Sequence, residues 1–236
     1  MNRLALACER NVSGAKGPAR HLLRAEIAAL PRLWAGGGPL PQVAPAARPQ
    51  PVILVPGFLT GPVLMRPMRR ALEAAGHRVE DWGQSVNLGL TAANLAGLGE
   101  RIRSLYARAG APVTLVGWSL GGLFAREAAR HAGDAVARVI TMGSPFSGDR
   151  RANNAWRLYN LVAGHSVDHP PGLGDVAEKP PVRTLAIWSA ADGIVSPEAA
   201  AGREGERDAV AQVHCRHMLM PSDAATIAAV LAEIDS

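Results

Sequence analysis

Short apolar runs alternate with helical segments from residue 51 onward, and this alternation constrains the fold more than any other feature of the sequence. Residues 52–55 and 113–118 are apolar at nearly every position, which is typical of strands buried on both faces. The segments between such runs carry apolar residues at helical spacing, and two of them end at Gly76 and Gly110. A strand–helix repeat of this kind predicts an α/β fold with a mostly parallel central sheet and helices on both faces.

The alternation starts only after residue 50, so the chain is expected to divide there. Residues 1–50 are expected to hold a helix at 19–34 followed by a Pro/Gly-rich linker. Residues 51–236 are expected to form one domain, in which residues 145–181 are an insertion that we interpret as a short lid. The expected strands are 52–55, 77–82, 113–118, 136–142, 182–188 and 212–214, and the expected helices are 63–75, 94–109, 120–131 and 224–234.

Length and composition argue against several classes of protein. The 236 residues, of which 48% are hydrophobic and 19% charged, suit one folded domain rather than a disordered chain. The net charge of +5 comes from scattered arginines without interleaved aromatic residues, so we expect no nucleic-acid partner. The two cysteines cannot build a disulfide framework, and no apolar run is long enough for a signal peptide or a transmembrane helix, so we expect a cytoplasmic protein.

A serine stands at the junction of an expected strand and an expected helix, in the sequence G-W-S-L-G. On such a sharp turn the serine has a strained backbone, and Gly117 and Gly121 allow the strand and the helix to approach one another closely. The helix that begins after Ser119 points free N–H groups and the positive end of its dipole toward any oxyanion formed there. We therefore expect Ser119 to be a nucleophile; an ordinary glycine-rich turn is the alternative interpretation.

A serine hydroxyl needs a base and an acid that orients the base, and in sites of this type both follow the serine along the chain. Asp192 comes just after an expected strand, at the sheet edge where sites of α/β proteins gather, and we prefer it to Asp168 and Asp175 of the insertion. For the base we prefer His217, which lies in the turn before the last helix. His214 is expected to lie on the last strand, where its side chain would pack rather than reach the serine.

Two further sets of residues complete the expected site. An oxyanion hole needs two backbone N–H groups aimed at one point, and we assign them to Leu120 and to Phe58, which follows Gly57 in the loop after the first strand. Trp156 and Tyr159 belong to an apolar patch of the insertion and are candidates for lining a substrate pocket. Packing over the sheet edge is the alternative interpretation of this patch.

Two groups of possible metal ligands are set aside, and we expect no metal site. The first group is His165, Asp168 and His169; it lacks a further ligand at a fixed position and is followed by two prolines, so we interpret it as loop surface. The second group is His214, Cys215 and His217, whose members are too close in sequence to surround a metal ion by themselves. We interpret Cys215 as a small buried residue, because nothing around it forms a nucleophile turn.

Four motifs carry a resemblance to a known family. They are P-G-F at 56–58, G-W-S-L-G-G at 117–122, G-S-P-F at 143–146 and D-G-I-V at 192–195. With these motifs the chain resembles the α/β-hydrolase-fold serine esterases and lipases of the small bacterial type, over roughly residues 50–235. The sequence Cys-Arg-His stands before the last helix where the family usually carries Gly-Ser-His.

The resemblance implies hydrolysis of carboxylic esters through an acyl-enzyme intermediate, without a cofactor. By this resemblance Ser119 is the nucleophile, Asp192 the acid and His217 the base, while Phe58 and Leu120 supply the oxyanion-hole amides. The expected partner is a small-molecule or lipid-like ester substrate. An acyltransferase or a thioesterase with the same triad is an alternative, and a non-catalytic binding protein that retains the fold is another. The sequence does not indicate an oligomeric state.

Overall fold

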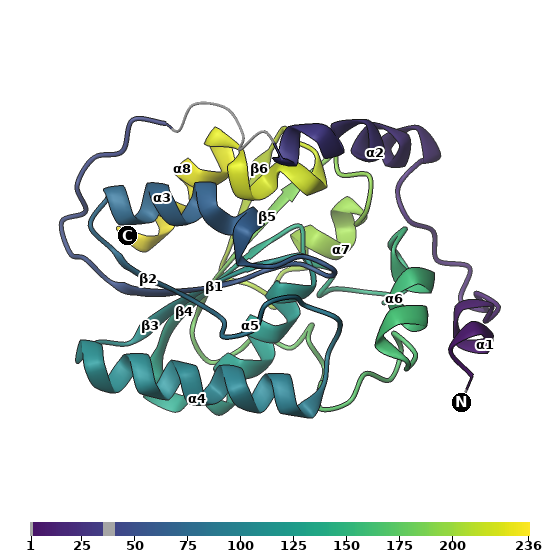
Figure 1. Ribbon diagram of the computed structural model, residues 1–236, viewed down its shortest axis with the longest axis horizontal. Helices are drawn as coiled ribbons and strands as arrows, with labels where there is room; N and C mark the ends of the chain where they lie inside the picture. The colour runs from purple at the N-terminus through teal and green to yellow at the C-terminus, as the bar shows by residue number, and fades with distance from the viewer. Residues whose placement is uncertain (1, 35–40) are drawn as a thin grey trace.

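The computed structural model describes residues 2–34 and 41–236, and a six-stranded sheet lies at its centre (Figure 1). The order across the sheet is β2-β1-β3-β4-β5-β6, and every neighbouring pair is parallel. The expectation of a mostly parallel sheet is therefore confirmed. The strands are β1 (Pro51–Val55), β2 (Arg78–Asp81), β3 (Val113–Trp118), β4 (Val136–Met142), β5 (Arg183–Ser189) and β6 (Ala209–Val213).

Helices cover both faces of the sheet. Figure 1 shows α3 (Arg66–Ala74) and α8 (Ala224–Ile234) on one face, and α4 (Ala92–Ala109) and α5 (Leu120–His131) on the other. The remaining α-helices are α1 (Arg3–Ala7), α2 (Arg20–Trp34), α6 (Trp156–Ala163) and α7 (Pro197–Ala201), and the 3₁₀ helices are η1 (Pro62–Met65), η2 (Gly133–Ala135) and η3 (His217–Ser222). None of the described helices is long and apolar enough to cross a membrane.

The side chains of β1 alternate between two apolar cores. Val52 and Leu54 pack with residues of α3 and α8, whereas Ile53 and Val55 pack with residues of α4 and α5. All four are buried, as the continuous apolar run predicts for a strand covered on both faces. Burying one such side chain contributes about 1.5–3 kcal/mol, so these cores hold the strand ends in place.

The chain reverses its direction across the sheet between β1 and β3. From β1 it moves to β2 at one edge, and β3 then lies on the other side of β1, followed in order by β4, β5 and β6. At such a switch point the loops that leave two adjacent strands run to opposite faces of the sheet, as those toward α3 and α5 do here, and they leave room for a ligand between them. The loop after β1 and the turn after β3 therefore form the natural location for a site.

The structure differs from the sequence-based expectations at several elements. The last strand is β6 at Ala209–Val213 rather than 212–214, so His214 lies beyond the strand and is exposed. Helices α1 and α7 were not predicted from the sequence. Residues 41–50 of the expected linker form no helix or strand, and its Gly-Gly-Gly run at 36–38 lies outside the described residues.

Candidate active site

Ser119 occupies the turn between β3 and α5 in an unusual backbone conformation. Its φ is 55° and its ψ is −123°, and Leu59 is the other non-glycine residue of the described chain with positive φ. The Ser119 N–H donates a hydrogen bond to the carbonyl of Met142, 2.8 Å away at the end of β4. Such conformations cost about 1–3 kcal/mol and persist where the surrounding structure enforces them, as buried parallel strands do here.

Gly121 allows α5 to begin against the end of β1. A Cβ atom at this position would overlap the carbonyl oxygen of Val55 and lie 2.7 Å from that of Pro56. Only glycine fits so close to the end of β1. Gly121 therefore sets how closely the first turn of α5 packs on that strand. The same contact brings the loop after β1 next to Ser119.

Asp192 and His217 form a buried pair. The Asp192 side chain follows β5 and is 1% exposed, and His217 begins η3 and is 2% exposed. His217 Nδ1 lies 2.7 Å from Asp192 Oδ2, while Asp192 Oδ1 accepts hydrogen bonds from the N–H groups of Ile194 and Val195, both at 2.8 Å. The carboxylate is therefore fixed by its own loop. It holds the imidazole through Nδ1, so Nε2 is the ring nitrogen that this pair leaves unused.

The buried pair lies beside the serine turn. Trp118, the residue before Ser119, donates a hydrogen bond from its indole Nε1 to the His217 carbonyl at 3.1 Å, and its ring centroid is 5.8 Å from that of the imidazole. Within the described residues no hydrogen bond joins the Ser119 hydroxyl to His217.

The surroundings of His217 favour its protonated form. Burial alone would lower the pKa of this imidazole, but the charge of Asp192, the hydrogen bond to that carboxylate and the charge of Glu26 raise its pKa above the usual 6.5. Two nearby carboxylates, that of Asp192 first, are the physical cause, because each negative charge stabilises the imidazolium in surroundings that solvate it poorly. An imidazolium formed by proton transfer from a serine would be stabilised in the same way.

The backbone N–H groups of Phe58 and Leu120 have no hydrogen-bond partner among the described residues. Leu120 follows Ser119 in the chain, and Phe58 follows Gly57, where a Cβ atom would lie 3.2 Å from Cβ of Ser119. Leu120 is the first residue of α5, where a helical N–H has no partner within its own helix. The loop that carries Phe58 is held by the buried side chain of Asn87, whose amide donates to the Pro56 carbonyl at 2.8 Å. The Asn87 carbonyl in turn accepts from the Leu59 N–H at 2.8 Å.

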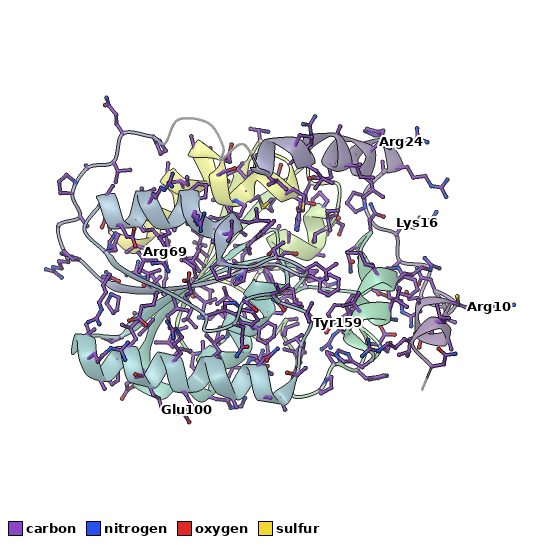
Figure 2. All side chains as sticks on the ribbon, viewed as in Figure 1. Arg10, Lys16, Arg24, Arg69, Glu100 and Tyr159 are labelled. Carbon is purple, nitrogen blue, oxygen red and sulfur yellow. The ribbon has the colours of Figure 1, made fainter. Side chains whose placement is uncertain are left out.

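An apolar pocket of about 560 Å³, part of it open to solvent, has Ser119 in its wall. Phe58 and Leu120 also line it, as do Trp156 and Tyr159 of α6, which are each 5% exposed. Leu90 donates its N–H to the Tyr159 hydroxyl at 3.2 Å, and Figure 2 shows Tyr159 between α6 and the body of the protein. Burial raises the pKa of Tyr159 to about 12, so this hydroxyl is neutral over the ordinary pH range.

No protein-family model matches the sequence, and no curated protein matches it either. Solved structures do match. The mature lipase from Bacillus licheniformis is 17% identical, with a TM-score of 0.57 and coverage of 85% of this chain and 96% of that one. Naproxen esterase from Bacillus subtilis is 12% identical, with a TM-score of 0.53 and coverage of 82% and 86%. The thioesterase domain from the curacin biosynthetic pathway is 15% identical, with a TM-score of 0.54 and coverage of 82% and 93%.

The chain has the α/β-hydrolase fold. In this α/β-hydrolase fold the residues expected from the sequence come together at the carboxyl ends of the strands. An atom at the Cβ position of Gly143, after β4, would lie 3.0 Å from His217 Nδ1 and 3.1 Å from Asp192 Oδ2. Because Met142 accepts the hydrogen bond from Ser119, the end of β4 contacts both the serine turn and the buried pair.

The weaker sequence candidates lie elsewhere in the α/β-hydrolase fold or are chemically unsuited. His214 is exposed after β6, so the expectation that it packs on a strand was wrong. Burial raises the pKa of the Cys215 thiol to about 12, which disfavours the nucleophilic thiolate. Asp168 is paired with Arg151 at 2.6 Å. Within residues 2–34 and 41–236 no group of three His, Cys, Asp or Glu side chains could hold a metal ion.

One residue beside the site was missed by the sequence analysis. Glu26 lies on α2, is 2% exposed, and accepts hydrogen bonds from the backbone N–H groups of Gly193, His217 and Met218. No local pattern marks it, because a single glutamate in an amphipathic helix is usually a solvated residue. Only the packing of α2 on the α/β-hydrolase fold brings this carboxylate to the loops that carry Asp192 and His217.

We predict that the imidazole of His217 titrates above pH 6.5 and that Asp192→Asn lowers its pKa. The replacement removes a negative charge and leaves Asn as a neutral hydrogen-bond partner, so the imidazolium loses stabilisation. NMR titration of histidine ring signals, with His217→Gln to assign the resonance, measures both values. A His217 pKa that is unchanged or higher in Asp192→Asn would contradict the electrostatic description of the pair.

Proposed function

We propose that this chain is a serine hydrolase that cleaves carboxylic esters through an acyl-enzyme intermediate, with Ser119, His217 and Asp192 as its catalytic triad. The observation that carries the proposal is a serine on a strained strand-to-helix turn, in the wall of an apolar pocket, beside a buried Asp–His pair. Solved structures with this fold include a lipase and a carboxylesterase, which supports the same reaction class.

In the proposed acylation step the Ser119 hydroxyl oxygen attacks the ester carbonyl carbon. His217 Nε2 accepts the hydroxyl proton, while Asp192 holds Nδ1 and stabilises the imidazolium. The carbonyl oxygen becomes an oxyanion, and the N–H groups of Phe58 and Leu120 donate to it. The imidazolium then protonates the departing alkoxide, so that an alcohol leaves and the acyl group remains as an ester of Ser119.

In the proposed deacylation step a water molecule takes the place of the alcohol. His217 accepts a proton from the water as its oxygen attacks the acyl carbon, and the same two amides stabilise the second tetrahedral intermediate. The bond to the Ser119 oxygen breaks, the imidazolium returns its proton to that oxygen, and a carboxylic acid is released. No cofactor takes part in this sequence of steps.

The pocket indicates the class of substrate. Its lining is mainly apolar, and Trp156 and Tyr159 add aromatic surface next to the serine, which suits an apolar acyl chain of a small-molecule or lipid-like ester. In this proposal residues 145–181, which include α6, act as the lid over the acyl group. Each methylene buried there would contribute up to about 0.8 kcal/mol to binding.

A thioesterase is the second candidate, because one neighbour with this fold is a thioesterase domain. The same triad would attack a thioester, and an acyltransferase would differ only in the acceptor that replaces water. Comparing oxygen esters with thioesters of the same acyl chain, and adding alcohols as competing acceptors, separates the three reactions. A non-catalytic binding protein would turn over none of these substrates.

We predict that Ser119→Ala lowers the turnover of p-nitrophenyl esters at least about a thousandfold and leaves the fold intact, because it removes only the attacking atom. His217→Ala should have a comparable effect, whereas His214→Ala should retain activity, because the His214 side chain is exposed. Steady-state rates and circular dichroism check this set. Substantial turnover by Ser119→Ala would reject Ser119 as the nucleophile. A larger loss of turnover in His214→Ala than in His217→Ala would reject His217 as the base.

We predict that Trp156→Ala changes the preference among ester chain lengths more than it changes activity toward acetate, because it removes pocket wall that only longer chains would contact. Leu158→Ala on the same helix is the matched control, since this side chain is 48% exposed and does not line the pocket. Rates with acetate and octanoate esters, together with thermal melts, check the prediction. If Trp156 serves only the core, the rates with both esters should fall in parallel, and the protein should lose about 3–5 kcal/mol of stability.

A further inference from the structure

The carboxylate of Glu26 connects α2 to both halves of the Asp–His pair. Oε1 accepts from the Gly193 N–H at 2.9 Å and from the His217 N–H at 2.7 Å, and Oε2 accepts from the Met218 N–H at 3.1 Å. Gly193 directly follows Asp192 in the chain. One side chain therefore holds the loop of the acid and the loop of the base by their backbones.

The orientation of α2 places this glutamate against the protein and leaves two large apolar residues of the helix exposed. Glu26 and Ala29 are buried, whereas Ile27 is 60% exposed and Leu30 is 39% exposed. Figure 2 shows Arg24 on the outer side of α2, away from the sheet. Burying a carboxylate is unfavourable unless hydrogen bonds replace its lost hydration, and the three backbone N–H groups supply them.

The approach of α2 to the acid loop is close enough to require glycine at position 193. A Cβ atom there would lie 2.5 Å from the carbonyl oxygen of Leu22 and 2.8 Å from Cγ of Glu26. Among the described residues no Lys or Arg pairs with Glu26, so its hydrogen bonds go to the two loops of the site rather than to a surface ion pair.

From these contacts we propose that Glu26 is a positioning residue, which fixes Asp192 and His217 relative to one another and makes α2 part of the catalytic apparatus. This inference rests on the proposed function, because positioning matters to the rate only if the pair is catalytic. A displacement of about 1 Å in a catalytic group can cost about a hundredfold in rate. The competing explanation is that Glu26 only anchors α2, in which case its loss would lower stability and leave the chemistry unchanged.

Glu26→Gln is the decisive variant, because it keeps the length of the side chain and one carbonyl acceptor but places an amide donor where Oε2 meets the Met218 N–H. We expect kcat to fall about 10- to 100-fold while KM stays within about twofold. The matched control is Glu233→Gln, another buried carboxylate, paired with Arg183 at 2.9 Å at the start of β5. It should lower the melting temperature and leave kcat unchanged.

Proton NMR gives a readout that anchoring alone would not move. The proton shared by His217 Nδ1 and Asp192 should produce a far-downfield signal in the unaltered protein, and this signal should shift or broaden in Glu26→Gln and persist in Glu233→Gln. Glu26→Asp is a second variant if Glu26→Gln does not fold. It keeps the charge, draws the carboxylate back from the three N–H groups, and should show the same loss of kcat.

The outcomes separate this inference from the proposed function. Folded Glu26 variants that keep both kcat and the imidazole signal, with only a lower melting temperature, would overturn the positioning role. If the unaltered protein hydrolyses no ester, the proposed function is wrong. The imidazole signal then decides alone whether Glu26 sets the geometry of the pair: a signal unchanged in Glu26→Gln would overturn the inference.

Discussion

The whole site depends on the strained turn that places Ser119 between β3 and α5. The φ of 55° is imposed by the buried sheet, because β3 ends between β1 and β4 and α5 begins where Gly121 meets the Val55 carbonyl. A loop without such constraints would relax to an ordinary conformation, because a strained residue of this kind costs about 1–3 kcal/mol. The two apolar cores on either side of the sheet therefore support the site as well as the fold.

Electrostatics in the site follow from where the chain buries its carboxylates. Asp192 and Glu26 are both nearly inaccessible to solvent, and backbone N–H groups of the neighbouring loops replace their lost hydration. Both lie close to His217, and their charges raise the pKa of that imidazole despite its burial. A site arranged in this way favours a reaction that transfers a proton to the imidazole, and the proposed acylation step is such a reaction.

Much of the candidate site could be proposed from the sequence, because local patterns mark its members. Gly117, Ser119 and Gly121 stand at the junction of a strand and a helix, and Asp192 and His217 follow strand ends. Tertiary contacts that leave no local pattern could not be predicted. Glu26 is one example, because the apolar pattern of α2 includes Ile27 and Leu30, which the structure exposes. The beginning of β6 is another, because a strand at the sheet edge is only partly covered and Val210 stays 43% exposed.

Covalent labelling with a fluorophosphonate tests whether Ser119 is an activated nucleophile, as we propose. Such reagents phosphonylate serines whose hydroxyl is activated by a base and spare ordinary serines. The measurement is tandem mass spectrometry of the labelled, digested protein, with heat-denatured protein as the control. We predict one phosphonyl adduct, on Ser119, that forms only in the folded protein. A folded protein that forms no adduct at Ser119 would contradict this prediction.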